Sequence, residues 1–514
     1  MRDLKIGVSA LPLFVLTAVA LTIAGVSGRS GRQDRAWQIP KTWDDRAMAT
    51  LEVPLAVAAA SPVPVSADYY YRIPPRPIYK TYPVYHPSKE PPGYFERLKT
   101  LEPEIVRLDV STIRTESDWI RAGEIVFDTP TDYDISGSPS QFRDASYYTA
   151  LGIPVAGDGT VPFVKYVVRD KGKVEVGVLG CVTCHTRVMP SGTIVKGAQG
   201  NFPFDRTGPP ELPDEALPVF RRLFKLLYSV PWLGAQDPAL PFQTMAFREI
   251  VGHAMAIPPG VQARHGTAPQ IPTQIPDLIG VQERRYLDHT GLVRHRGIAD
   301  LMRYAALNQA VDLYSRHGDF VPVGDDFRTV PDPRAESPFP FANGRYRDEE
   351  LYALARFIYS LQAPTNPNIP TGQTRKGQEV FVGEGCGTCH TAPLYTNNRL
   401  TPAVGFHPAQ DQERVDVMTR SVRTDPGLAL RTRRGTGYYK VPSLKGVWYR
   451  GPFEHSGSVA TLEDWLNPRR LRDDYVPTGF KGYGVKTRAV KGHEFGLRLS
   501  PADKAALIAF LKTL

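Results

Sequence analysis

The stretch Cys181-Val-Thr-Cys-His185 returns later in the chain as Cys386-Gly-Thr-Cys-His390, and these two motifs contain every cysteine of the 514 residues. Two thiols three positions apart, with an imidazole directly after them, suit covalent capture of haem, because the thiols can add to the vinyl groups and the histidine can ligate the iron. The alternatives are a zinc site that joins both cysteine pairs and a thioredoxin-type dithiol. A dithiol does not need a histidine twice, so the sequence predicts two covalently bound c-type haems. The residues expected to bind them are Cys181, Cys184, His185, Cys386, Cys389 and His390, with the two histidines on the irons.

Each motif is preceded and followed by matching helical segments. Gly123-Glu-Ile-Val-Phe127 stands before the first motif, and Gly377-Gln-Glu-Val-Phe381 stands before the second. Residues 350–361 and 503–514 also match, with apolar side chains at helical spacing that predict a core-facing helix at the end of each half. The chain is therefore an internal duplication.

A second matched segment follows each motif. Residues 275–291 align without gaps on residues 441–457, and the alignment pairs His289 with His455. Because the two histidines fall at the same place in each copy, we expect them to share a structural role, such as a hydrogen bond to a haem propionate or to the backbone.

These repeats predict a mainly α fold with two tandem cytochrome c-like domains, residues 116–361 and 372–514, each binding one covalent haem. Prolines after residue 361 stop the last helix of the first domain and mark the linker. The first domain is larger because residues 129–180 separate its leading helix from its cysteines. This insert contains a strand-like run from Val161 to Val178.

Residues 29–115 belong to neither domain. They are rich in proline and tyrosine and show no helical or strand periodicity. Since tyrosine-dense segments seldom stay solvated, we expect an irregular, extended N-terminal arm that packs over the domains through its aromatic rings, rather than a flexible linker.

The N-terminus and the charge indicate where the protein resides. Arg2 and Lys5 precede an apolar stretch over residues 6–26, which predicts that residues 1–28 are either a cleaved signal peptide or a membrane anchor. The folded part is then periplasmic or otherwise extracytoplasmic, secreted or attached to the inner membrane. The net charge of +9 comes from scattered Lys and Arg with no basic run among aromatics, so nucleic acid is not an expected partner.

The order of the motifs resembles a known family, the bacterial di-haem cytochrome c peroxidases with their MauG-type and haem-dependent rubber-oxygenase relatives. The resemblance rests on both haem motifs, on residues 390–396, on Val441-Pro-Ser-Leu leading to His455-Ser-Gly-Ser458, and on the final helix from Ser500. It covers about residues 117–514 and leaves out the first hundred or so.

The resemblance implies that peroxide or dioxygen reacts at the N-terminal haem, on His185, and that the C-terminal haem, on His390, is six-coordinate and relays electrons. The family takes the second ligand of the relay haem from the last part of the chain, often as a methionine. Here Met418 lies too early, and His493 stands where the ligand falls. His493 is therefore the predicted ligand, with His455 as the alternative.

The departures from the family suggest an open first haem. His289 replaces the tryptophan that the peroxidases place between the haems, so an electron path through His289 or Tyr286 is expected. No histidine occurs between residues 186 and 248, where the peroxidases carry a ligand. The expected pocket helix, residues 298–314, has no carboxylate at the family's position, which favours an apolar pocket for dioxygen and an apolar substrate. Its pocket candidates are Leu301, Tyr304, Ala305 and Gln309.

Three function classes follow. The first is an oxidoreductase, peroxidase- or oxygenase-like, whose redox partner is a small cytochrome or a cupredoxin. The second is a pure electron-transfer cytochrome in which both irons are six-coordinate. The third is a haem-based sensor or structural module. In the second class the ligand candidates for the first haem are His253, His265, His317, Met189, Met245 and Met255.

Overall fold

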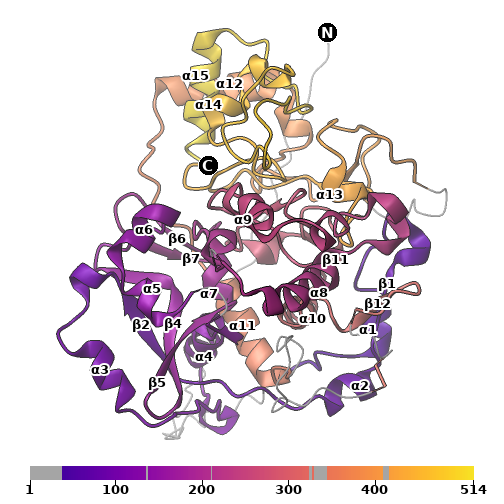
Figure 1. Ribbon diagram of the computed structural model, residues 1–514. Coiled ribbons are helices and arrows are strands. Elements are labelled where there is room, and N and C mark those ends of the chain that lie inside the picture. Colours follow the sequence, from indigo (N-terminus) through magenta and orange to yellow (C-terminus); the bar gives the residue numbers. More distant parts are fainter. Residues whose placement is uncertain (1–36, 135–136, 210, 323–326, 329–343, 409–415) are drawn as a thin grey trace, which may run out of the picture. The chain divides into compact units, whose positions relative to one another are not determined.

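Two helix pairs repeat in the structure, a computed structural model that describes residues 37–134, 137–209, 211–322, 327–328, 344–408 and 416–514. α4 (Glu116–Asp128) packs on α11 (Asp348–Ser360), and α12 (Gly372–Gly383) packs on α15 (Pro501–Leu511) (Figure 1). These are the helices predicted before each motif and at the end of each half, and their positions are confirmed.

A glycine in each leading helix allows the close approach. A Cβ atom on Gly123 would lie 1.9 Å from the carbonyl oxygen of Ala353, and one on Gly377 would lie 2.0 Å from that of Ala506. Only glycine fits such a backbone-to-backbone contact. Two edge-to-face phenylalanine pairs repeat beside these glycines, Phe127 with Phe357 and Phe381 with Phe510.

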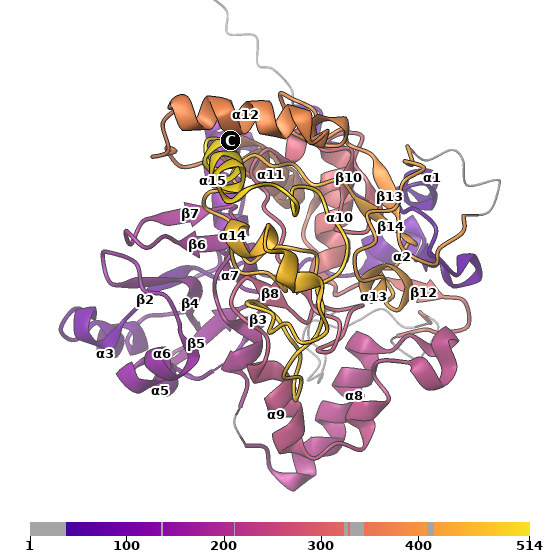
Figure 2. The ribbon, with the colours of Figure 1, turned by 90° about the horizontal axis from the view of Figure 1, so that it is seen from above.

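A four-stranded antiparallel sheet precedes the first haem motif. Its strand order is β2 (Thr81–Tyr85), β4 (Thr160–Asp170), β5 (Lys173–Val178), β3 (Asp132–Tyr133). The hairpin of β4 and β5, with Tyr166 opposite Val176, is the strand-like run predicted from the sequence. Side chains from α3 (Tyr94–Lys99), α5 (Pro139–Phe142) and α6 (Ala145–Leu151) share a buried core with this sheet (Figure 2).

The N-terminal arm is more regular than predicted. It forms α1 (Asp45–Ala49), β1 (Pro62–Pro64) and α2 (Ala67–Arg72), and it supplies strand β2 of the sheet. β1 pairs with β12 (Ser315–His317). These elements span three to six residues each, too few for a periodic pattern in the sequence. The tyrosines pack as aromatic contacts: Tyr70 is buried and stacks on Trp43 with ring centroids 4.3 Å apart.

The remaining elements include two 12-residue helices, α8 (Leu217–Tyr228) and α10 (Ile298–Gln309), and several shorter helices and strands. The shorter ones are α7 (Cys181–Cys184), β6 (Thr186–Val188), β7 (Ile194–Lys196), α9 (Phe247–Met255), β8 (Val261–Gln262), β9 (Thr273–Gln274), β10 (Tyr286–Leu287), β11 (Val293–Arg294), β13 (Leu400–Pro402), α13 (Gly427–Leu430), β14 (Tyr438–Lys440) and α14 (Leu462–Trp465). The mainly α prediction is therefore only partly right, because strands and irregular connections separate the helix pairs. α10 ends earlier than predicted, since Val311 and Asp312 adopt left-handed backbone conformations.

Residues 39–514 pack into one compact unit that contains both haem motifs. The predicted signal or anchor, residues 1–28, lies outside the described residues. Within the part of the chain that the structure describes, no helix combines the length and the apolarity needed to cross a bilayer.

Candidate functional site

The first haem motif begins at α7, and His185 follows that helix directly. Nδ1 of His185 donates a hydrogen bond to the carbonyl oxygen of Pro276 at 3.0 Å, which leaves Nε2 with a lone pair for a metal. Burial lowers the pKa of His185 to about 4, so its ring is neutral. The same burial raises the pKa values of the Cys181 and Cys184 thiols to about 12. Both stay protonated, and neither forms a disulfide.

The second motif repeats this arrangement on a short 3-10 helix, Cys386–Thr388. Nδ1 of the buried His390 donates to the carbonyl oxygen of Tyr395 at 3.1 Å, and Nε2 is again free to bind a metal. Burial lowers the pKa of His390, while hydrogen bonds to the backbone of Tyr395 and Pro442 act in the opposite direction. Pro442 aligns with Pro276 in the internal repeat, and the carbonyl oxygen of Pro276 accepts the hydrogen bond from His185.

A second imidazole faces His390. The ring of His493 lies with its centroid 6.3 Å from that of His390, and the two planes are inclined by 58°. Two imidazole nitrogens bound at about 2.0 Å on opposite sides of one metal would place their ring centroids about 6 Å apart. Nδ1 of His493 is buried without a hydrogen-bond partner, and Trp465 and Phe495 pack on the ring. The pair therefore fits an iron held between the two histidines.

A buried arginine holds the loop that carries His493. The guanidinium of Arg470 donates to the carbonyl oxygens of Val490 at 2.7 Å, Gly492 at 2.9 Å and His493 at 2.8 Å. The N–H of His493 donates to Val422 at 2.6 Å, and His493 has a φ of 45°. These bonds fix a left-handed backbone conformation that is unfavourable for a residue with a Cβ atom.

Among the described residues, no second imidazole is paired with His185 as His493 is with His390. Nδ1 of His253 and Nε2 of His317 are, however, also buried without a hydrogen-bond partner. His253 packs on Phe242 and Tyr483, Nε2 of His265 lies 3.2 Å from a carboxylate oxygen of Asp312, and Nδ1 of His317 lies 3.3 Å from Ala60 O. Of the methionine candidates, Met189 and Met245 pack at the edges of hydrophobic clusters, and Met255 is exposed.

The zinc alternative does not fit the described residues. Across the described ranges, which include all four cysteines, no group of three or more His, Cys, Asp or Glu side chains lies close enough to hold a metal ion. Each motif instead presents two neutral thiols and one imidazole with a free Nε2, which is the donor set that a covalently attached haem requires.

The two repeats meet through reciprocal backbone hydrogen bonds. Gln274 N–H donates to the carbonyl oxygen of His455, and Lys440 N–H donates to that of His289, each at 2.8 Å. Gln274 and Lys440 directly precede the two aligned segments, so the exchange follows the internal repeat. In addition, Nε2 of His289 donates to the carbonyl oxygen of Gln274 at 2.7 Å.

Comparison with known proteins gives distant matches. No family model matches the chain. The uncharacterized protein y4iJ of Sinorhizobium fredii is 37% identical over 15% of this chain and 18% of its own length. The cytochrome-c peroxidase IdrP2 of Denitromonas iodatirespirans is 27% identical over 28% of this chain and 40% of its own length. The chain resembles the di-haem cytochrome c peroxidase/MauG family.

This peroxidase-like chain spans less than half the length of these two curated relatives. Among solved structures, a MauG-like protein associated with microbial copper homeostasis is 17% identical, with 60% of this chain and 92% of that chain covered and a TM-score of 0.29.

In the peroxidase-like chain, the predicted pocket helix α10 faces a buried charged cluster. Leu301 is buried, and the hydroxyl of Tyr304 lies 3.3 Å from a carboxylate oxygen of Asp288. Asp288 also accepts hydrogen bonds from Arg434 at 2.7 Å and from Arg264 at 3.1 Å. The surroundings of Tyr304 are thus charged, where the sequence led us to expect an apolar pocket.

Sequence reasoning missed this cluster because its members are far apart in the chain. Burial opposes ionisation of Asp288, yet Arg434 and Arg264 hold its pKa well below the usual range. The cluster also reaches the first motif, because the charge of Arg264 contributes to the lowered pKa of His185. The one available signal was the position of Asp288 next to His289.

The alternative ligand His455 does not face His390. Its Nδ1 pairs with the carboxylate of Glu454, and its Nε2 lies 3.1 Å from the hydroxyl of Tyr439. The structure therefore favours His493 over His455 as the partner of His390.

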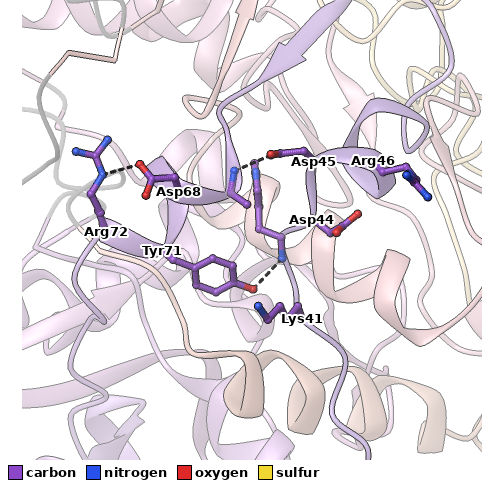
Figure 3. Close-up of a pocket in the computed structure, with 9 residues that line it drawn as sticks. Lys41, Asp44, Asp45, Arg46, Asp68, Tyr71 and Arg72 are labelled. Atoms are coloured by element: carbon purple, nitrogen blue, oxygen red, sulfur yellow. Dashed lines mark hydrogen bonds and ion pairs between the residues drawn. The ribbon is translucent and has the colours of Figure 1, made fainter.

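A surface hollow of about 750 Å³ lies elsewhere, between α1 and α2 (Figure 3). Side chains of both charges line it, with Arg72 paired to Asp68 at 3.3 Å and Asp45 accepting from Ala67 N–H at 2.7 Å. Every residue that lines it falls between positions 41 and 72, so it contains no part of either haem motif.

Proposed function

We propose that the chain is a di-haem c-type oxidoreductase. Peroxide or dioxygen reacts at the haem on His185, and the haem on His390 and His493 relays electrons. The observation that carries the proposal is the difference between the two sites: a second buried imidazole faces His390 at 6.3 Å, while among the described residues no imidazole is paired with His185 in this way.

The sequence of the first repeat supports an open first iron. The loop with His493 precedes α15, and its counterpart precedes α11 at residues 329–343, a stretch that lies outside the described residues. That stretch contains no histidine, methionine or cysteine. The first repeat therefore has no ligand at the position where the second repeat has one.

The residues of each site have separable tasks. Haem, when bound, supplies an iron that exchanges electrons and takes a small oxidant where a coordination position is open. The two cysteines of each motif attach the porphyrin, and the histidine directs a neutral Nε2 toward the iron. The carbonyl oxygens of Pro276 and Tyr395 fix the orientation of the two histidines.

The repeat junction provides a route for electrons between the sites. His185 is bonded to Pro276, two residues after Gln274, whose carbonyl accepts from the His289 ring. The carbonyl of His289 in turn accepts from Lys440, two residues before Pro442. We assign the inter-haem path to this chain of short covalent and hydrogen-bonded steps through His289.

Electrons enter at the second motif. Gly385 and Thr388 beside the cysteines of the second motif are exposed and Gly387 is half-buried, whereas Val182 and Thr183 between the cysteines of the first motif are 2% and 1% exposed. Thr183 is also bonded to Phe163 in β4, so the sheet insert covers the first motif. A small cytochrome or a cupredoxin would therefore reach the second haem more closely than the first.

A peroxidase assay with motif variants tests the proposal. With hydrogen peroxide and a reduced small cytochrome, the full holoprotein should turn over. Loss of the second haem, in Cys386→Ala/Cys389→Ala, should abolish steady turnover and leave a direct reaction of peroxide with the first haem. Loss of the first haem, in Cys181→Ala/Cys184→Ala, should abolish both. Turnover that survives loss of the first haem would contradict the proposal and favour a pure electron-transfer protein.

A further inference from the structure

A buried tyrosine at the repeat junction is bonded to a histidine–carboxylate pair. The hydroxyl of Tyr439, in β14, lies 3.1 Å from Nε2 of His455, and the two rings stack with centroids 4.3 Å apart. Nδ1 of His455 pairs with the carboxylate of Glu454. In the neutral tautomer of His455 with its hydrogen on Nδ1, toward Glu454, Nε2 is an unprotonated base beside the phenol oxygen.

Glu454 is fixed as the charged end of this chain of groups. Ser456 donates to its carboxylate from the backbone N–H at 2.9 Å and also from its hydroxyl. Burial opposes ionisation of Glu454, but His455 and Ser456 lower its pKa to about 2. The side chain is therefore an anion that can stabilise a protonated His455. Three further charged groups act on these residues. Arg470 interacts electrostatically with Glu454, Asp425 with Tyr439, and Arg488 donates to the hydroxyl of Ser458 at 2.6 Å.

The pair lies where the two repeats contact each other. Lys440, the residue after Tyr439, donates its N–H to His289 of the first repeat, and the carbonyl of His455 accepts from Gln274 of the first repeat. Ile271, also from the first repeat, packs on the cluster that contains Tyr439. Tyr439 thus belongs to the same junction that we assign to inter-haem electron transfer.

We propose that Tyr439 is a redox-active residue that gives an electron to the haem pair and its proton to His455. The proposal rests on the proposed function, because the oxidant is hydrogen peroxide reacting at the first haem. With haem bound, hydrogen peroxide would take two electrons from the protein and two protons from solvent to become two waters. Tyr439 would supply one electron and the haem pair the other, and the phenolic proton would move to Nε2 of His455. The products on the chain are a neutral tyrosyl radical and a His455 cation paired with Glu454.

The carbonyl oxygen of Asp425 is the other acceptor around the phenol, and it cannot take the phenolic proton. The phenol has a single hydrogen, which it donates to the carbonyl oxygen of Asp425 at 2.6 Å, and its oxygen accepts from Ala429 N–H at 3.3 Å. The hydroxyl hydrogen must therefore turn from Asp425 to Nε2 of His455 before it is transferred. An amide carbonyl can accept a hydrogen bond but cannot hold the proton at neutral pH. The imidazole of His455 is the base in contact with the hydroxyl, and the carboxylate of Glu454 beside Nδ1 would stabilise its cation.

Rapid freeze-quench EPR of the holoprotein mixed with one equivalent of hydrogen peroxide tests the proposal. A radical signal near a g value of about 2.0 should appear, and its hyperfine splitting should narrow when the protein contains ring-deuterated tyrosine. Tyr439→Phe should lose the signal, while Tyr438→Phe, a buried neighbour on the same strand, should retain it. His455→Gln removes the proton acceptor and should reduce the yield several-fold. The labelled wild-type protein tests for a tyrosyl radical even where a variant folds poorly.

The outcomes separate this proposal from the proposed function. If peroxide changes the haem optical spectrum but no tyrosyl radical forms, or if Tyr439→Phe keeps the radical, then Tyr439 is not redox-active and the oxidoreductase proposal stands. If peroxide leaves the haem spectrum unchanged, the Tyr439 proposal and the peroxidase form of the proposed function are both overturned. A lost radical in Tyr439→Phe with an unchanged haem reaction is the result that we expect.

Discussion

The imidazoles of His390 and His493 face each other with centroids 6.3 Å apart, although the two residues come from opposite ends of the second repeat. His390 follows α12, and His493 precedes α15. These helices pack tightly because Gly377 lets the backbone of Ala506 approach. The helix pair therefore sets the separation of the two rings, and the same pair in the first repeat, α4 with α11, has no ligand at the corresponding place in the sequence.

Removal of His493 should open the second haem. In His493→Ala, one of the two iron sites should change from low-spin to high-spin and begin to bind carbon monoxide, since the ring that faces His390 is gone. The readouts are EPR and the optical spectrum of the reduced protein with carbon monoxide. His455→Ala is the matched control, because His455 bonds to Tyr439 and Glu454. A spin change in the control and none in His493→Ala would show that the ligand is wrongly assigned.

Arg470 should position His493 and tune the second iron. Arg470→Lys keeps the charge but not the fan of hydrogen bonds to Val490, Gly492 and His493. It should give a mixture of spin states with a nearly unchanged reduction potential. Arg470→Gln loses a buried cation that favours the reduced iron, so the potential of the second haem should fall as well. EPR and a redox titration measure the two effects.

The exposed Arg472, paired with Asp474, is the control for both substitutions at position 470. Arg472→Gln should change neither the spin state nor the potential. A potential that stays constant in Arg470→Gln would rule out an electrostatic role, and the arginine would then be a structural clamp alone.

Gly123 and Gly377 should each be intolerant of alanine. An added Cβ at either glycine would come within 2.0 Å of a carbonyl oxygen on the facing helix, so the pair must separate. We expect a loss of about 1 to 3 kcal/mol in the free energy of unfolding. Chemical denaturation measures it. Gly383→Ala, at the end of α12 with no atom within 4 Å of its Cβ position, should be neutral or slightly stabilising. Equal effects at Gly377 and Gly383 would contradict the packing account.

The repeated helix pairs could be predicted because their sequence signals are short. Each leading helix has a glycine four residues before a phenylalanine, and each terminal helix has apolar residues at helical spacing. The charged cluster could not be predicted, because Asp288 and Arg434 come together only when the two repeats dock. Strand β2 was not predicted from the sequence, for a related reason. Thr81–Tyr85 is short, contains Pro83, and gains its strand character from pairing with β4.

The same cluster should make stability depend on pH through Glu52. Burial raises the pKa of Glu52 to about 8; Asp312 and Asp288 raise it further and Arg434 opposes them. Between the unfolded value near 4.5 and about 8, the folded chain holds a proton that the unfolded chain has released. Stability should therefore fall as pH rises through this window, by at most about 1.4 kcal/mol per pH unit.

Glu52→Gln should remove that contribution. Denaturation midpoints measured from about pH 5 to about pH 8 should fall less steeply in the variant than in the wild-type protein. Glu96→Gln, on an exposed side chain that pairs with Lys99, should leave the slope unchanged. Parallel slopes in the wild-type protein and Glu52→Gln would mean that Glu52 is ionised in the folded state.

The central claim is that one haem is open and the other is closed by His493. The most direct measurement is the EPR and optical spectrum of the oxidised and half-reduced holoprotein, with and without carbon monoxide. We predict one high-spin haem that binds carbon monoxide once reduced and one low-spin haem that does not. Two low-spin haems that never bind carbon monoxide would contradict the account.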